Sequence, residues 1–184
     1  MNIWKELLSL FGWKVNITVP VRNKCVICVA PHTSNWDFLL GLFAYRSLGR
    51  KANFLMKEFW FFFPLKYILY ALGGIPVSRK KAGKTSLTEK VIKLFEAKPY
   101  LNLAVTPEGT RSYTEKWKTG FLYIAYGAHV PIQLGVIDYS KKEIAINEEY
   151  NPSGDIDKDM KHIRDFYDSF KEAALYPEKF ATTR

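Results

Sequence analysis

The feature that most constrains the fold is an alternation between short apolar runs and longer segments with helical periodicity. The run "KCVICVA" at 24–30 is continuous, apolar and rich in β-branched residues, which is typical of a strand buried on both faces of a parallel sheet. Strands that alternate with helices favour an α/β fold with a largely parallel central sheet flanked by helices. Further strands are predicted at 52–57, 74–79, 100–106, 131–139 and 143–147, and helices at 35–48, 85–97 and 117–127.

Both ends of the chain are predicted to be helical. Within the amino-terminal segment 1–14, residues 3–11 place their apolar side chains on one face, so this helix suits either packing on the core or a place on a membrane surface. A charged carboxy-terminal helix is predicted over 155–175. Because the 184 residues contain no internal repeat or linker, we expect one domain over 1–184.

Aromatic residues make up 16% of the chain and gather in its first half. The stretch 59–77 comes closest to a membrane span, but Pro64, Lys66 and Gly73 interrupt it, whereas a span needs about 20 predominantly apolar residues. We therefore expect one or two short helices broken at Pro64. Their aromatic side chains suit an acyl groove, a bilayer surface or a packed core.

The net charge of +9 favours an anionic partner, which leaves nucleic acid, an anionic membrane surface or a phosphorylated small molecule. The sequence has no zinc-finger, coiled-coil or RNA-stacking signature. Nucleic acid is therefore not an expected partner.

Two cysteines, Cys25 and Cys28, lie three positions apart in the strand predicted at 24–30. Side chains at that spacing on a strand point to opposite faces, and no second cysteine pair could complete a zinc site. We expect two buried free thiols in a reducing compartment and no metal site. The amino terminus lacks the features of a signal peptide, so a cytoplasmic location is expected.

The stretch "PHTSNWD" at 31–37 contains the residues best suited to proton transfer. His32 follows the strand, and Asp37 would lie in the first turn of the next helix, which Ser34 or Asn35 could cap. From there the carboxylate could orient the imidazole and stabilise its protonated form. An aspartate in a first turn is also favourable simply because of the helix dipole, so a structural role remains open.

A second candidate stretch, "TPEGTRS" at 106–112, suits anion binding. A glycine permits positive φ or close backbone approach, successive backbone N–H groups can form an anion nest, and an arginine can grip phosphate with two hydrogen bonds. Glu108 could accept from a substrate hydroxyl or pin the loop. The alternative is a Pro-Glu-Gly turn with a surface arginine. The residues of interest are Glu108, Gly109, Thr110, Arg111 and Ser112.

Arg79 follows a short predicted strand in "GGIPVSRKKAGK" at 73–84, where several lysines come after it. It could supply a second phosphate ligand, or the segment could be a solvated basic loop.

Taken together and in chain order, "PHTSNWD", "GGIPVSR", "PEGTRS" and "HVPI" resemble the four sequence blocks of the glycerolipid acyltransferase family. That family includes glycerol-3-phosphate and 1-acylglycerol-3-phosphate acyltransferases. The resemblance covers roughly residues 28–137. Pro31 stands where the family usually has asparagine, and Thr106 where an aromatic or apolar residue is common.

The resemblance implies a glycerol-3-phosphate acyltransferase-like fold and a role for each matched position. His32 and Asp37 would be the catalytic pair. The acceptor's glycerol phosphate would be bound by Arg79, Glu108, Gly109 and Arg111, with Thr110 and Ser112 completing the same block, and Val130 and Pro131 would shape the acyl-donor pocket.

The implied activity is transfer of a fatty acyl group from an acyl thioester, carried on coenzyme A or on an acyl carrier protein, to a hydroxyl of a phosphate-bearing glycerolipid. Lysophosphatidic acid is the favoured acceptor, and no permanently bound cofactor is expected. The enzyme would work peripherally on the inner face of an anionic membrane. Two rival functions are a non-catalytic phospholipid-binding module and a thioester hydrolase.

Overall fold

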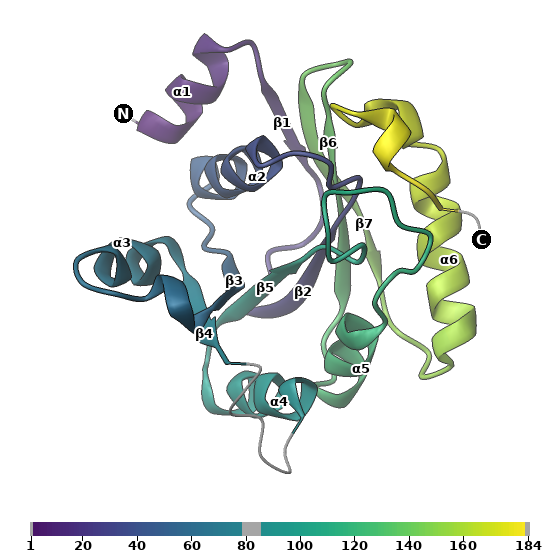
Figure 1. Cartoon of the computed structure of the whole chain (residues 1–184). Helices are drawn as coiled ribbons and strands as arrows, with labels where there is room; N and C mark the ends of the chain where they lie inside the picture. Colours follow the sequence, from purple (N-terminus) through teal and green to yellow (C-terminus); the bar gives the residue numbers. More distant parts are fainter. Residues whose placement is uncertain (1, 79–85, 183–184) are drawn as a thin grey trace.

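The computed structural model describes residues 2–78 and 86–182, which form a single α/β domain built on one sheet (Figure 1). Within these residues the sheet has seven strands in the order β1-β7-β6-β2-β5-β3-β4. Their bounds are Lys14–Ile17 for β1, Lys24–Val29 for β2, Asn53–Lys57 for β3, Gly74–Val77 for β4, Leu101–Val105 for β5, Ile132–Asp138 for β6 and Glu143–Tyr150 for β7.

The sheet is largely parallel, as the alternation of strands and helices predicted. Strands β6, β2, β5, β3 and β4 run in one direction. Strand β7 is antiparallel to β6, and the short edge strand β1 pairs parallel to β7. The carboxyl ends of β5, β2 and β6 therefore lie side by side at one edge of the sheet.

Helices cover both faces of the sheet (Figure 1). Helices α1 and α2 lie on one face, α4, α5 and α6 cover the other, and α3 lies beside β4. The helices span Ile3–Leu10 (α1), Trp36–Ser47 (α2), Leu65–Leu72 (α3), Leu87–Ala97 (α4), Gly120–Gly127 (α5) and Ile156–Asp168 (α6).

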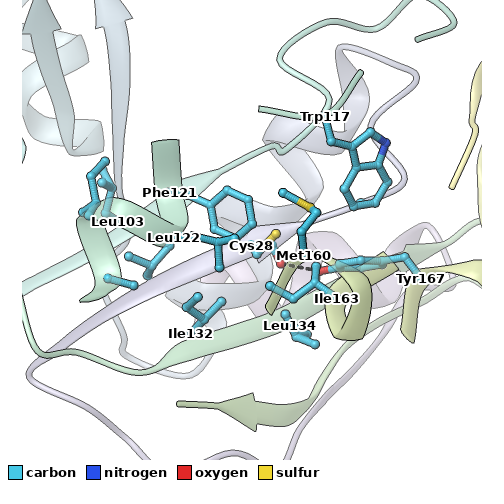
Figure 2. Close-up of a cluster of buried hydrophobic side chains, with 14 of the residues drawn as sticks. Cys28, Leu103, Trp117, Phe121, Leu122, Ile132, Leu134, Met160, Ile163 and Tyr167 are labelled. Carbon is cyan, nitrogen blue, oxygen red and sulfur yellow. Dashed lines mark hydrogen bonds between the residues drawn. The ribbon is translucent and has the colours of Figure 1, made fainter. Parts of the chain in front are cut away.

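The larger part of the core fills the space between the sheet and α4, α5 and α6. Figure 2 shows Phe121 and Leu122 of α5 and Ile163 of α6 pointing toward the strands. The Tyr167 hydroxyl, which is fully buried, donates to the Cys28 carbonyl at 2.6 Å. This packing fixes β2 and hence the position of the loop that follows it.

The two cysteines behave as the strand spacing predicted. Cys25 packs with Tyr45 on the α2 side of the sheet, whereas Cys28 lies in the cluster on the α6 side. Both are free thiols and fully buried. Burial raises the pKa of Cys25 to about 12, so this thiol stays protonated at neutral pH.

The structure corrects several predicted boundaries. The strand β1 was not predicted, because four residues are too few to show a clear alternation. The carboxy-terminal helix predicted over 155–175 ends at Asp168. Beyond it the chain turns back through two short 3₁₀ helices, η2 (Lys171–Ala173) and η3 (Pro177–Lys179), and buries Ala173 and Phe180 in the core.

The aromatic stretch forms two short helical pieces, as predicted: the 3₁₀ turn Glu58–Trp60 and helix α3, with Pro64 between them. Across the described part of the chain, no helix combines the length and the apolar character needed to cross a bilayer.

Candidate active site

Three polar side chains come together where neighbouring strands end. His32 follows β2, Glu108 follows β5 and Tyr139 follows β6. Because β5, β2 and β6 are adjacent and parallel, their carboxyl ends deliver these residues to one place. This is the edge at which α/β sheets usually bind ligands.

His32 and Asp37 form the predicted pair. Asp37 is the second residue of α2, and its Oδ2 lies 3.1 Å from Nδ1 of His32. The imidazole is 16% exposed and the carboxylate only 2%. The Asp37 carboxylate is therefore buried, whereas the His32 ring that it contacts is partly exposed to solvent.

The Asp37 carboxylate also organises the loop before α2. Its Oδ2 accepts from the backbone N–H groups of Thr33 and Ser34, both at 2.9 Å, and its Oδ1 accepts from the Tyr139 hydroxyl at 2.6 Å. Burial acts to raise the pKa of Asp37, but the hydrogen bonds from His32, Tyr139 and Ser34 outweigh it and hold that pKa below its ordinary value. The carboxyl group is therefore ionised at neutral pH.

An ionised Asp37 selects the tautomer of His32. The carboxylate can only accept, so in the neutral imidazole the proton sits on Nδ1 and the lone pair is on Nε2. Nε2 is then the ring nitrogen able to take a proton from a substrate.

The predicted capping of α2 takes a different form in the structure. The Asn35 side chain makes no capping bond. Its Oδ1 instead accepts from Nη1 of Arg111, and this links α2 to the loop after β5. Ser34, the other predicted capping residue, accepts from the first N–H of the helix, that of Trp36, at 3.1 Å through its hydroxyl.

Glu108 lies directly behind the histidine. Its Oε1 accepts from the His32 backbone N–H at 2.8 Å, and the residue is only 4% exposed. Burial raises the pKa of Glu108 to about 7, against the lowering effect of that hydrogen bond. Of the two roles predicted for Glu108, the observed contact is the one that pins the loop.

The remaining residues of the second stretch form an exposed turn next to the histidine loop. Gly109 has a φ of +64°, and a Cβ there would lie 3.2 Å from Cγ of Lys118, so both the backbone angle and the space favour glycine. Thr110 Oγ1 accepts from the Ser112 N–H at 3.2 Å. Arg111 is exposed, and its hydrogen bond to Asn35 holds it beside the loop that carries His32.

A cavity of about 710 Å³ opens at this site and extends between α2 and the sheet. His32, Asn35 and Arg111 line its polar end. The rest of the lining is apolar and comes from strands across the sheet, including Ile17, Val29, Phe54, Ala104, Ile137 and Ile146. The cavity thus has the His32–Asp37 pair and the Arg111 cation at one end and apolar side chains along the rest of its wall.

The two residues predicted to shape the acyl-donor pocket do not line this cavity. Val130 and Pro131 precede β6, and Val26 of β2 pairs with Ile132. Val130 packs with Val26 and Ile132 in the core cluster on the side of α5 and α6. Arg79 lies outside the described residues.

Sequence reasoning missed Tyr139. This residue ends the predicted strand 131–139, and the rule that ligands bind at the carboxyl ends of parallel strands, applied to a third strand, would have singled it out. Within 2–78 and 86–182, no group of three or more histidine, cysteine or acidic side chains is arranged to hold a metal ion.

Comparison with known proteins identifies the class. The profile of the acyltransferase family matches residues 14–136, about two thirds of the chain. The chain belongs to the acyltransferase family, as its sequence blocks indicated. A search of curated proteins finds no match.

Among solved structures, the chain is similar to the crystal structure of PlsC, the 1-acyl-sn-glycerophosphate (LPA) acyltransferase from Thermotoga maritima. The TM-score is 0.59 at 18% sequence identity, and the match covers 91% of this chain and 76% of that one. At this identity the likeness establishes a shared fold.

Proposed function

We propose that the protein transfers a fatty acyl group from an acyl thioester to a hydroxyl of a phosphate-bearing glycerolipid, with lysophosphatidic acid as the first acceptor to test. The observation that carries the proposal is the His32–Asp37 contact of 3.1 Å at the polar end of the apolar cavity. A general base, a cation and a space for an alkyl chain in one site are what such a reaction needs.

The chemistry follows from the tautomer of His32. Nε2 takes the proton of the acceptor hydroxyl as that oxygen forms a bond to the thioester carbonyl carbon. Asp37 stabilises the imidazolium that results. The tetrahedral intermediate then collapses, the carbon–sulfur bond breaks, and the imidazolium returns the proton to the leaving thiolate. The products are an ester and a free thiol.

In this proposal Arg111 and the cavity bind different parts of the substrates. The exposed guanidinium of Arg111 binds the acceptor phosphate, for which its paired N–H groups are suited. The apolar cavity under α2 takes an acyl chain in place of the pocket predicted at Val130 and Pro131. Coenzyme A and an acyl carrier protein both remain candidate carriers of the donor.

One assay separates this proposal from its two rivals. Thiol release from palmitoyl-CoA is followed with and without lysophosphatidic acid or glycerol 3-phosphate. Release that requires an acceptor and yields the acylated product supports the transferase. Equal release without acceptor would identify a thioester hydrolase, and no release would leave a phospholipid-binding module.

The dyad is tested by His32→Ala, for which we expect turnover to fall about 10²–10⁴-fold, the usual contribution of a general base. The control is His162→Ala, because His162 also contacts a carboxylate, Glu148, at 2.8 Å but lies on α6, away from the cavity. Wild-type turnover in His32→Ala would contradict the assignment.

A further inference from the structure

The exposed phenylalanine and tryptophan side chains of the described residues all lie in the first half of the chain. Among the described residues, every exposed phenylalanine and tryptophan precedes the strand β4, whereas the exposed large apolar residues after it are tyrosines and one leucine. The first group consists of Phe11, Trp36, Phe38, Phe59, Trp60, Phe62 and Phe63, and the second of Leu87, Tyr113, Tyr123, Tyr126 and Tyr176.

The densest part of the first group is the aromatic segment, defined here as residues 58–70. Phe59 is 79% exposed and Phe63 is 75% exposed. In helix α3 Leu69 is buried, while Tyr67 and Ile68 are more than half exposed. Figure 1 shows this segment standing out at the side of the molecule. A contiguous apolar surface of this kind indicates an interaction site.

The aromatic segment adjoins the cavity. A Cβ on Gly74 would lie 3.1 Å from Phe61 and 3.3 Å from Phe54, so the segment packs on the face of β4 and β3 that carries Phe54. The Phe54 ring in turn meets the Phe38 ring edge-on at 4.7 Å. Because Phe38 and Phe54 both line the cavity, the aromatic segment continues directly into the cavity wall.

Charge gathers in the same half of the chain. Residues 1–85 contain 13 lysines and arginines against 3 acidic residues, whereas residues 86–184 contain 14 against 15. Lys57, which is exposed, immediately precedes the aromatic segment, and within it the Lys66 ammonium lies 5.1 Å from the centre of the Tyr67 ring. Exposed aromatic rings flanked by lysines suit the boundary between anionic headgroups and acyl chains.

We propose that the aromatic segment docks the protein onto an anionic phospholipid bilayer and thereby brings the cavity wall at Phe38 and Phe54 to the lipid surface. Docking requires no catalysis, so it can be measured with vesicles in the absence of any acyl donor or acceptor. Only the benefit of docking, namely direct access of a lipid substrate to the cavity, rests on the proposed function.

The test compares two double variants on vesicles made of equal parts phosphatidylcholine and phosphatidylglycerol. Phe59→Ser/Phe63→Ser removes the two most exposed rings of the segment, and Tyr113→Ser/Tyr123→Ser removes two exposed rings elsewhere. In a flotation assay we expect the first variant to lose at least about tenfold in vesicle affinity, because two large apolar side chains no longer leave water. The control should bind like wild type.

Two further readouts sharpen the result. Wild-type binding should weaken on vesicles of phosphatidylcholine alone and at high salt, since the lysines then lose their anionic partners. The fluorescence of Trp60, which is 48% exposed, should shift to the blue on binding, and Trp60→Phe should lose that shift. Thermal unfolding of each variant verifies that the fold is retained.

Equal vesicle binding by wild type and Phe59→Ser/Phe63→Ser would overturn the docking proposal. If that same variant also dissociated a wild-type dimer, the segment would be an interface between copies of the chain instead. An inactive wild type that still bound vesicles would contradict the proposed function and leave docking intact. An active wild type that did not bind vesicles would contradict the docking proposal and leave the proposed function intact.

Discussion

The Tyr139 hydroxyl donates to Oδ1 of Asp37 at 2.6 Å, across 102 positions of sequence. His32 contacts the other oxygen of the same carboxylate, so the two partners together fix the plane of the carboxyl group. Tyr139 is itself held on two sides: its N–H donates to the Ala173 carbonyl at 2.8 Å, and its ring meets Trp13 edge-on at 5.2 Å. The dyad thus has a third, positioning member.

The first prediction concerns Tyr139→Phe, which removes that hydrogen bond and keeps the ring. We expect kcat to fall about tenfold with both KM values unchanged, because a hydrogen bond to a charged group contributes about 1.5–3 kcal/mol. The acid limb of kcat/KM against pH should also move to higher pH, because this contact helps to lower the pKa of Asp37. Steady-state kinetics across pH measure both effects.

The chain offers a matched control for this variant. The Tyr150 hydroxyl donates to Oδ1 of Asp159, also at 2.6 Å, where β7 meets α6. Tyr150→Phe removes an equivalent bond far from the dyad and should leave kcat and the pH profile unchanged. A similar loss of kcat in both variants would mean that Tyr139 acts only through stability.

The second prediction tests Arg111 as the phosphate ligand. Arg111→Ala should raise KM for lysophosphatidic acid about tenfold and change kcat little, because the lost contact is made equally in ground state and transition state. The variant should also lose the preference for lysophosphatidic acid over monoacylglycerol, which has the same acyl chain but no phosphate. Arg22→Ala, which breaks an exposed ion pair with Glu149, is the control. An unchanged acceptor preference in Arg111→Ala would rule out this role.

The fold could be predicted from sequence to the extent that local signals agreed with tertiary packing. The buried run 24–30 became β2 as expected, since its apolar residues suit no other place. The predicted helix 155–175 ends at Asp168, and the chain that follows it buries Phe180 against Trp117, at 5.8 Å between ring centres. Such long-range contacts leave no periodic trace in the sequence.

The site was predictable where its residues lie close together in the chain. The spacing of His32 and Asp37 indicated their contact, because a loop and the first turn of a helix bring positions five apart together. The bond from Tyr139 to Asp37 depends on β6 being the neighbour of β2, and strand order cannot be read from alternation. The cavity depends on how α2 lies over the sheet, which is likewise a tertiary property.

The third prediction tests whether the cavity takes the acyl chain. Gly41 of α2 lines the cavity, and a Cβ there would have Ile137 as its nearest neighbour at 3.9 Å. Gly41→Leu should stabilise the fold by about 1 kcal/mol through helix propensity while filling part of the cavity. We expect turnover with palmitoyl-CoA to fall relative to octanoyl-CoA.

Ala97→Leu adds similar bulk to an exposed position at the end of α4, on the opposite face of the sheet, and should leave that ratio unchanged. If Gly41→Leu also left the palmitoyl-to-octanoyl ratio unchanged, the acyl chain would have to bind elsewhere.

The last prediction follows from the buried carboxyl group of Glu108. Its pKa rises from an ordinary 4.5 to about 7 in the folded protein, so between these values the folded state holds a proton that the unfolded state has lost. The resulting stability, about 3 kcal/mol, is fully present below pH 4.5 and is lost as the pH rises through 7.

Glu108→Gln cannot ionise and should remove this loss, while its side-chain oxygen can still accept from the His32 N–H. Urea unfolding at pH 5 and pH 8 should therefore show a larger drop in unfolding free energy for wild type than for the variant. Asp37 does not interfere, because its pKa is lowered and it stays ionised across this range. Equal drops in the two proteins would show that Glu108 is already ionised at pH 5.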